Sequence, residues 1–390
     1  MMHPDTRLGH YIECSVAGER VRAFVPPKLP IRPAIKIEGK LIELLEKANR
    51  ALGRLDGVSE LLPDTALFVY MYVRKEALLS SQIEGTQSSL SDLLLFENDA
   101  MPGLPLNDVQ EVSNYVAALT YGLKRIKDEN FPLSARLLRE IHSVLLAKGR
   151  GAERDPGEFR SSQNWIGGSR PGNALFIPPP YERVPDLIAN LEKFLHDYDE
   201  PTPVLVKAAI AHVQFETIHP FLDGNGRLGR LLITLLLCSE GVLQEPNLYL
   251  SLYFKRHRKT YYDLLQQVRM EGVWELWLEF FLEGVRETSQ QAFATAKALL
   301  ALFDEDRKRI EGLGRSAHTA LRLHEYVQKK PAITIQDAIQ AMSLTHPTVS
   351  GRIKDLEKLG ILSEITGKGR NRVWLYTRYL NILNEGTEPL

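Results

Sequence analysis

Residues 219–230 of this 390-residue chain read His-Pro-Phe-Leu-Asp-Gly-Asn-Gly-Arg-Leu-Gly-Arg, and they lie between two stretches of helical periodicity. Pro220 disfavours the right-handed helical region for His219, so the first helix is predicted to stop there and to present the imidazole toward the following loop. Phe221 alternates with His219 and Asp223, and we expect it to point into the core. The segment is therefore predicted to be a helix–helix loop with a histidine at one end.

The second half of this loop has the composition of an anion-binding site. Gly224, Asn225 and Gly226 tolerate tight or left-handed backbone geometry, so successive N–H groups can converge at the N-terminus of a helix that begins near Arg227. Such a nest, aided by the helix dipole, binds phosphate. Arg227 and Arg230 are three residues apart on one helix face, where two guanidinium groups suit a polyphosphate.

Two less specific interpretations compete with this one. The glycines match the dinucleotide-binding fingerprint G-x-G-x-x-G, and Glu245 lies near the expected distance for its ribose-binding acid. That fingerprint requires a preceding strand, whereas residues 207–216 have a helical pattern, which excludes it. The other alternative is an ordinary turn with a capping Asp223 and two solvated arginines. The combination of histidine, aspartate, glycine nest and paired arginines favours a functional site.

At every specified position, residues 219–230 fit H-x-F-x-[DE]-G-N-G-R-x-x-R, so the chain resembles the Fic-domain family. The resemblance extends over roughly residues 37–290 and implies an all-α Fic fold with one β-hairpin flap. It also implies a protein adenylyltransferase, which moves AMP from ATP onto a Ser, Thr or Tyr hydroxyl of a protein target or of itself. ATP is then the substrate and Mg²⁺ the cofactor.

The family's roles, carried over to this chain, make His219 the general base and Asp223 the Mg²⁺ ligand. The phosphate-binding residues are then Gly224, Asn225, Gly226, Arg227, Leu228, Gly229 and Arg230, with the two arginines on the β- and γ-phosphates. The reaction is an in-line attack of the hydroxyl oxygen on the α-phosphorus, with pyrophosphate leaving. The intact Gly-Asn-Gly sequence favours AMP transfer over the kinase activity of relatives in which this loop is altered.

Residues 80–85, Ser-Ser-Gln-Ile-Glu-Gly, end a helical pattern and would by themselves be an ordinary helix terminus with a solvated carboxylate. Given the signature, Ser80, Glu84 and Gly85 match the family's inhibitory motif [ST]-x-x-x-E-[GN], which implies that Glu84 lies against Arg230. A bidentate pair there would occupy the guanidinium needed for the γ-phosphate. The resemblance therefore implies an autoinhibited enzyme and leaves open whether Glu84 also supports removal of AMP.

Residues 159–180 contain short β-favouring runs around paired glycines and are predicted to form a small hairpin. This insert resembles the family's flap, whose edge pairs with the target's backbone, and the flap residues are predicted to be Ile166 and Gly167. A surface hairpin without that role is the alternative. Tyr261 is predicted from a weaker pattern to line the adenine pocket, although aromatic residues at helical spacing more often belong to a core.

Residues 313–380 carry eleven Lys or Arg against five Asp or Glu, whereas the whole chain has a formal net charge of −1. Residues 334–342, a short turn and residues 346–359 form a helix-turn-helix pattern, and the β-favouring segments after it flank a basic turn. This resembles a winged helix. The candidate DNA contacts are Thr348, Arg352, Lys368, Arg370 and Arg372. A winged helix that docks on protein is an equally weighted alternative.

The composition, with 44% apolar and 25% charged residues, is that of a globular protein of two or three domains. The N-terminal residues lack a signal-peptide core, and the apolar run near residue 231 is too short to span a bilayer, so we expect a cytoplasmic protein without a membrane partner. Residues 1–35 are Pro-rich and are predicted to form an extended arm without periodicity. The fold class is predicted to be mainly α. The domains are predicted as 1–105, an N-terminal helical region with the inhibitory motif; 106–290, the Fic core; 291–312, a connecting helix; and 313–390, a winged helix-turn-helix domain.

Three functions remain open from the sequence. The favoured one is the autoinhibited adenylyltransferase. The second is a DNA-binding transcription regulator that uses an idle Fic core as a nucleotide sensor, and the third is a bifunctional enzyme that both adds and removes AMP. The sequence also leaves open whether the protein is a homodimer.

Overall fold

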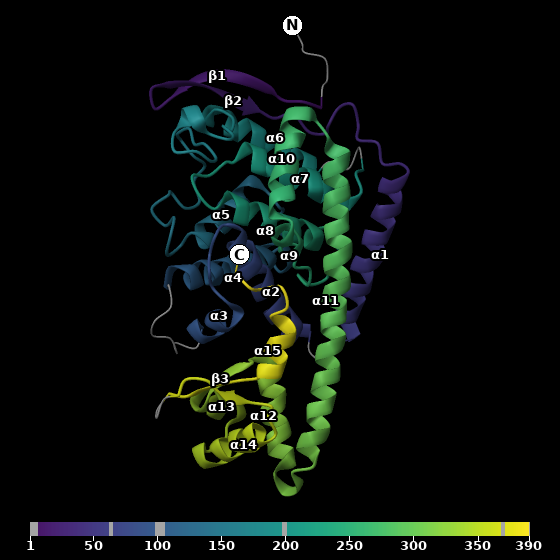
Figure 1. Ribbon diagram of the computed structural model, residues 1–390, viewed down its shortest axis with the longest axis vertical. Coiled ribbons are helices and arrows are strands. Elements are labelled where there is room, and N and C mark those ends of the chain that lie inside the picture. The colour runs from purple at the N-terminus through teal and green to yellow at the C-terminus, as the bar shows by residue number, and fades with distance from the viewer. Residues whose placement is uncertain (1–6, 62–64, 98–105, 197–200, 368–370, 390) are drawn as a thin grey trace.

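The computed structural model describes residues 7–61, 65–97, 106–196, 201–367 and 371–389, and it confirms the mainly helical fold class (Figure 1). The core helices are α1 Lys40–Leu61, α2 Thr65–Ile83, α3 Leu90–Phe96, α4 Leu106–Lys127, α5 Ala135–Leu145, α6 Val184–Leu195, α7 Val204–Ile218, α8 Asn225–Ser239, α9 Ser251–Arg256, α10 Arg258–Glu271 and α11 Trp274–Glu311. The C-terminal part contains α12 Ala317–Lys329, β3 Ala332–Thr334, α13 Ile335–Met342, α14 His346–Lys358, β4 Ser363–Glu364, β5 Val373–Leu375 and α15 Thr377–Leu383.

Two neighbouring helices, α7 and α8, form the centre of the core. Both are buried along almost their whole length, as expected for helices that are apolar on every side. Trp277 on α11 donates from its indole nitrogen to the Ala209 carbonyl on α7 at 3.0 Å, which ties α11 to this pair. The loop at residues 219–224 joins the two buried helices, so its backbone is held from both sides.

The 38-residue helix α11 connects the core with the C-terminal domain. It runs alongside α1 and continues to the foot of the molecule, where α12 turns back beside it (Figure 1). The segment predicted as a connecting helix at residues 291–312 is thus the second half of a helix that begins at Trp274. No helix in the described parts of the chain is long and apolar enough to cross a membrane.

The N-terminal arm differs from the prediction, because β1 His10–Val16 and β2 Glu19–Val25 pair as an antiparallel hairpin. The turn residues Ala17 and Gly18 have φ values of 49° and 82°, the geometry that tight hairpins require. The Phe24 N–H donates to the Ile177 carbonyl at 2.9 Å, so the hairpin lies over the flap. The prediction of an arm without periodicity was therefore wrong for residues 10–25.

The flap also differs from the predicted hairpin. Within the described residues, 159–180 contain one isolated bridge, between Ile166 and Phe176, and a 3₁₀ turn at Pro171–Asn173. Prolines in this stretch lack the N–H groups that a ladder needs. The Asn173 side chain instead accepts the backbone N–H groups of Ser169 and Arg170, each at 3.0 Å. The flap is a compact loop with one strand-like contact.

The C-terminal domain is a winged helix-turn-helix, as predicted. Its second helix α14 follows α13 after a short turn, and α13 begins with a capping box in which Thr334 and Asp337 bond each other's backbone N–H groups. The sheet has the order β3-β5-β4. Sequence analysis missed β3 because it is a three-residue strand that runs directly into a helix cap.

Candidate active site

His219 stands where α7 ends, with left-handed backbone angles of φ 49° and ψ 60°. Its N–H still donates to the Phe215 carbonyl at 2.9 Å, so His219 caps the helix that Pro220 prevents from continuing. A non-glycine residue in this region of backbone space is uncommon and is a mark of functional sites. The helix therefore ends at the predicted position.

Arg160, at the start of the flap, holds the backbone around His219. Its Nε donates to the His219 carbonyl at 2.9 Å, and its Nη2 donates to the Pro179 carbonyl at 2.5 Å and, more weakly, to Ile218 at 3.4 Å. The Arg160 N–H also donates to the Pro220 carbonyl at 2.9 Å. A buried cation thus satisfies the free carbonyls at a helix C-terminus. Sequence analysis missed this residue.

The imidazole of His219 is kept neutral at physiological pH. Burial lowers the pKa of His219 to about 3, and the positive charges of Arg269 and Arg160 add to this effect. The Nδ1 atom has no hydrogen-bond partner among the described residues. The imidazole is therefore unprotonated, which is the state that a general base must have before it accepts a proton.

Asn225 closes the loop with its side chain. The Asn225 Oδ1 accepts the Phe221 N–H at 2.9 Å, and its Nδ2 donates to the Phe221 carbonyl at 2.8 Å. Gly224 precedes it with φ 75°, and α8 starts at Asn225. The predicted glycine nest therefore lies at a helix N-terminus, although the Asn225 side chain itself is committed to the loop.

His142 on α5 contacts the same loop at Phe221 and Asp223. Its ring stacks on Phe221 with centroids 3.8 Å apart. The Gly157 N–H donates to Nδ1 at 2.8 Å, so Nε2 carries the proton and donates to the Asp223 carbonyl at 3.0 Å. Burial lowers the pKa of His142 to about 4, which keeps this tautomer neutral. His142 is a second supporting residue that the motif does not include.

Asp223 is the carboxylate nearest to the nest. Its Oδ1 accepts the Gly224 N–H at 2.5 Å and lies 3.4 Å from Arg227, while the side chain stays one-third exposed. Gly151 packs so closely that a Cβ there would lie 2.8 Å from Asp223 Oδ2. Among the described residues no group of three His, Cys, Asp or Glu could hold a metal ion. One exposed carboxylate suits Mg²⁺, which is commonly held by few carboxylates together with substrate phosphates.

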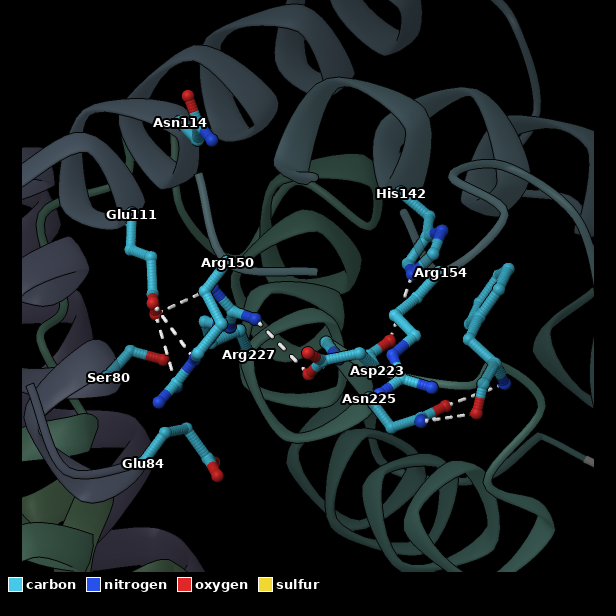
Figure 2. Close-up of polar contacts among 12 residues, drawn as sticks. Ser80, Glu84, Glu111, Asn114, His142, Arg150, Arg154, Asp223, Asn225 and Arg227 are labelled. Carbon is cyan, nitrogen blue, oxygen red and sulfur yellow. Dashed lines mark hydrogen bonds and ion pairs between the residues drawn. The ribbon is translucent and has the colours of Figure 1, made fainter. Parts of the chain in front are cut away.

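Arg227 is buried between two carboxylates, Asp223 and Glu111 (Figure 2). Glu111 on α4 accepts from Arg227 Nη1 at 3.0 Å and lies 3.0 Å from Arg150 Nε. Burial raises the pKa of Glu111, although both guanidinium groups oppose that change. Sequence analysis missed Glu111 and Arg150, which lie far from the motif in sequence and carry no local pattern.

Arg230 has a different set of partners. Its Nη2 donates to Glu84 Oε1 at 2.6 Å and to the Ser80 carbonyl at 3.0 Å, and its Nε donates to Ser80 Oγ at 2.9 Å. A Cβ on Gly226 would lie 2.3 Å from Glu84 Oε1, so the carboxylate also covers the nest. Burial alone would raise the pKa of Glu84, but Arg230 outweighs it and the pKa is lowered. Gly85 follows Glu84 with φ 103° and ends the segment.

The two motif arginines therefore do not point at one ligand in this state. They leave α8 toward carboxylates on different segments, Glu111 for Arg227 and Glu84 for Arg230. Leu228 is fully buried and its N–H donates within the helix to Gly224 at 3.0 Å.

Gly229 on α8 packs against the side chains of Glu216 and Phe215 on α7. A Cβ on Gly229 would lie 2.4 Å from Glu216 Oε1. Among the residues predicted to bind phosphate, Leu228 and Gly229 thus have packing positions.

Tyr261 lies in the core and not on a pocket wall. It is fully buried, and its hydroxyl forms a 2.8 Å hydrogen bond with His212 Nε2. Its neighbour Tyr262 is partly exposed, and burial followed by the charge of Glu84 raises its pKa. Tyr262, which is 41% exposed, is therefore the more accessible of the two tyrosines. The periodicity of α10 did not distinguish the two.

The flap residues lie beside the loop of the site. The Ile166 N–H donates to the Phe176 carbonyl at 2.8 Å, and its carbonyl accepts from Leu175 at 2.9 Å. Gly167 has φ 70°, with Leu175 packed against it. The Leu175 side chain is 78% exposed, which places an apolar group at the flap surface.

The DNA-contact candidates lie on the winged helix. Thr348 and Arg352 are on α14, where the Thr348 hydroxyl shares a 2.9 Å hydrogen bond with Thr345 and Arg352 pairs with Asp355 at 3.0 Å. Arg372 directly precedes β5. Lys368 and Arg370 fall outside the described residues.

Three family models match the chain. The Fic/DOC family N-terminal model covers residues 42–124, the Fic/DOC family model covers 132–237, and the winged helix-turn-helix DNA-binding model covers 317–363. The Protein adenylyltransferase Fic of Aedes aegypti is 29% identical over 255 residues, which are 65% of this chain and 47% of that protein. The Probable protein adenylyltransferase aq_aa38 of Aquifex aeolicus is 29% identical over 188 residues, 48% of this chain and 54% of that protein. The chain thus spans about half the length of the curated relatives it matches.

Two solved structures share the fold. A Fic family protein from Desulfovibrio desulfuricans aligns with a TM-score of 0.57 and 22% identity, over 88% of this chain and 98% of that one. A Fic domain containing signaling protein from Bacteroides thetaiotaomicron aligns with a TM-score of 0.50 and 20% identity, over 64% of this chain and 95% of that one.

Proposed function

The chain contains the N-terminal and catalytic domains of the Fic/DOC family followed by a winged helix-turn-helix domain, and we propose that it is a protein adenylyltransferase. It transfers AMP from ATP to a Ser, Thr or Tyr hydroxyl of a protein target or of itself. The single observation that carries this proposal is the position of His219 at the end of α7, one short loop before the N-terminus of α8, which carries Gly226, Arg227 and Arg230.

In the proposed reaction, the oxygen of the target hydroxyl attacks the α-phosphorus while His219 accepts the proton of that hydroxyl. The bond to the pyrophosphate oxygen breaks and pyrophosphate leaves. The N–H groups at the start of α8 and the arginines of the motif bind the phosphates. Asp223 would hold Mg²⁺, which neutralises phosphate charge when bound. Arg160 and His142 keep the loop in place.

In the described state the proposed enzyme is inhibited. Glu84 accepts a 2.6 Å hydrogen bond from Arg230 and lies over Gly226. In the proposed reaction Arg230 binds the γ-phosphate and the nest at Gly226 binds the adjoining phosphates. The pair is joined by one charge-assisted hydrogen bond and is not the bidentate pair that the sequence led us to expect; Arg230 is 2% exposed and Glu84 is 30% exposed. ATP must displace Glu84 from Arg230 to bind productively. The same carboxylate is the candidate for water activation if the enzyme also removes AMP.

The experiment is transfer of label from α-labelled ATP with Mg²⁺ in cell extract. Wild type is expected to label weakly, Glu84→Gly at least about tenfold more strongly, and His219→Ala not at all, since general acid–base assistance contributes roughly 10²–10⁴-fold. His318→Ala, at an exposed histidine of the winged helix, is the matched control and should label like wild type. Absence of label from the Glu84 variant would contradict the proposal.

A second candidate function rests on the winged helix. Eleven basic against five acidic residues in 313–380 favour binding to double-stranded DNA, with Thr348 and Arg352 on α14 and the wing at Lys368, Arg370 and Arg372. Fluorescence anisotropy with random duplex DNA should show affinity that falls steeply with salt, and replacing the three wing cations with serine should flatten that slope. We place the protein in the cytoplasm, and light scattering of the same preparation would show whether it is a homodimer.

A further inference from the structure

The residues that follow α15 contact the inhibitory segment 80–85 through Gln82. Residues 384–388 leave the winged helix and pack against α2 and α9 of the core (Figure 1). Lys75 Nζ donates to the Glu385 carbonyl at 2.9 Å, Gln82 Nε2 donates to the Thr387 carbonyl at 2.8 Å, and Lys255 Nζ donates to Gly386 at 3.3 Å and to Glu388. Every one of these bonds uses the main chain of the 384–388 segment.

Gln82 connects this contact to the inhibitory segment. It is fully buried and lies two residues before Glu84. Its Nε2 also donates to the Ser88 carbonyl at 3.0 Å, and its Oε1 accepts from Lys255 at 2.7 Å. The Gln82 amide therefore joins α9, the residues after Gly85 and the 384–388 segment at one point.

The core side of this contact is unusual for its buried cations. Lys75 is 0% exposed and Lys255 is 6% exposed, and Thr387 of the segment that covers them is 4% exposed. Two ammonium groups held away from water need several acceptors, and unpaired buried charges cost far more than hydrogen-bonded ones. The neighbouring main-chain carbonyls supply these acceptors, which is the chemistry of peptide recognition.

We propose that Lys75, Gln82 and Lys255 form a peptide-binding site whose occupant is the 384–388 segment, and that occupancy of this site holds Glu84 against Arg230. When the segment leaves, Gln82 and both lysines lose acceptors and the last turn of α2 loosens. Arg230 then becomes available to ATP. The consequence for catalysis rests on the proposed adenylyltransferase function, whereas the peptide site itself does not.

The segment is continuous with the winged helix through α15, which follows β5 of that domain. Arg378 on α15 bonds Asp306 on α11 at 2.9 Å, and residues 384–388 begin directly after α15 ends. A displacement of the winged helix therefore pulls on the segment and, through Gln82, on the inhibitory carboxylate.

Gly386→Val tests the site without changing a core residue. Gly386 has φ +78°, which strains any residue with a side chain, and a Cβ there would lie 2.7 Å from Leu252 Cδ1 and 3.0 Å from Arg256 Nη2, so we expect valine to displace the segment. Gly360→Val is the matched control, since Gly360 has φ +63° with open space around it. Lys255→Met removes the donor from the core side and provides an independent variant.

Two readouts separate the site from the function. Gly386→Val and Lys255→Met are expected to speed amide hydrogen exchange of residues 80–86 and to raise transfer from α-labelled ATP by about fivefold or more, whereas Gly360→Val matches wild type. Adding Gly386→Val to Glu84→Gly should give no further label. Unchanged exchange in both test variants would overturn the proposal. If Glu84→Gly itself transfers nothing, the adenylyltransferase function fails, and faster exchange in the two variants would still support the peptide site.

Discussion

The backbone of His219, a residue of the motif, is held by Arg160, which lies outside the motif. Arg160 satisfies carbonyls of His219, Pro179 and Ile218 through two separate nitrogens, a geometry that depends on the fixed fork of a guanidinium. A lysine retains the charge but concentrates its donors on one nitrogen. Replacing Arg160 with lysine therefore keeps the positive charge and removes the geometry that holds the backbone at His219.

We expect Arg160→Lys to lower kcat for AMP transfer by roughly 10- to 100-fold, because small misplacements of a reacting group are costly. The KM for ATP should change little, since Arg160 does not contact the nest. The assay is labelled transfer in the Glu84→Gly background. Arg170→Lys is the control, because Arg170 is exposed on the same flap and pairs with Glu19. An equal loss in the control would show that the flap, and not the His219 contact, matters.

The buried Glu216 predicts a dependence of stability on pH. Burial raises the pKa of Glu216 to about 7, against the attraction of Arg230 and Arg269 and with added repulsion from Glu84. A carboxyl whose folded pKa is raised contributes stability below about pH 4.5, and this contribution is lost as the pH rises to about 7. The free energy of unfolding should thus fall with rising pH across this window.

Urea unfolding at pH 5 and pH 8 tests this expectation. Glu216→Gln should remove up to about 3 kcal/mol of the wild-type difference between the two pH values, since each tenfold change in proton affinity corresponds to about 1.4 kcal/mol. Glu38→Gln, at an exposed carboxylate, should keep the full difference. If Glu216→Gln also keeps it, Glu216 is ionised in the folded protein.

At the scale of the helix pair, Gly229 permits the close approach of α8 to α7. A Cβ on Gly229 would meet Glu216 Oε1 at 2.4 Å and Phe215 Cδ1 at 3.2 Å, both in the buried core. The Glu216 carboxylate can shift, whereas the buried Phe215 ring has little room to do so. Overpacking against it costs about 1–3 kcal/mol, which we expect to outweigh the gain of up to about 1 kcal/mol from replacing a helical glycine with alanine. Gly229→Ala should therefore lower the free energy of unfolding.

Gly53→Ala supplies the opposite case in the same measurement. Gly53 lies in α1 with nothing within 4 Å of an added Cβ, so only the helix propensity changes and stability should rise by about 0.5–1 kcal/mol. Opposite signs for the two variants are the expected result. Two stabilising changes would mean that α7 and α8 can separate without penalty.

The helices were predictable from local patterns, whereas the elements that depend on tertiary contact were not. Residues 204–218 and 225–239 have helical patterns in the sequence, and a proline and glycines mark the loop between these two segments. The β1–β2 hairpin has the turn Ala17-Gly18 instead of a typical Asn-Gly turn, and its inner face is covered by the flap, where Phe24 lies 6.1 Å from Phe176. Its strand character thus depends on a distant segment.

The same distinction applies to the site. The motif supplied His219 and both arginines, because the chemistry of the loop is contiguous in sequence. Glu111 is 116 residues from Arg227, and Arg160 is 59 residues from His219, so neither left a pattern near the motif. Their roles follow from the packing of α4 and of the flap against α8, which only the folded chain provides.

Helix α11 joins the helical core to the winged helix, and Asp306 on this helix contacts the C-terminal domain. This buried carboxylate accepts from Tyr376 Oη at 2.7 Å, Arg378 Nη1 at 2.9 Å and Arg309 Nη1 at 2.7 Å. Two cations and a hydroxyl thus depend on one negative charge. Removing one partner of a buried ion pair is strongly destabilising, by about 3–5 kcal/mol.

Arg309 and Arg378 are 37% and 38% exposed, so water can solvate them after the change, and Asp306→Asn should weaken attachment of the winged helix to α11 by roughly 1–3 kcal/mol. We expect faster limited proteolysis near residues 312–316 and a separate, earlier thermal transition for the winged helix. Asp304→Asn is the control, because Asp304 is 61% exposed and pairs with Lys308 on its own helix, where such pairs contribute at most about 0.5 kcal/mol. If the Asp306 variant unfolds in one transition at the wild-type temperature, the winged helix is held by its apolar contacts alone. Faster exchange at residues 80–86 in the same variant would link this attachment to the inhibitory segment, because α15 carries residues 384–388.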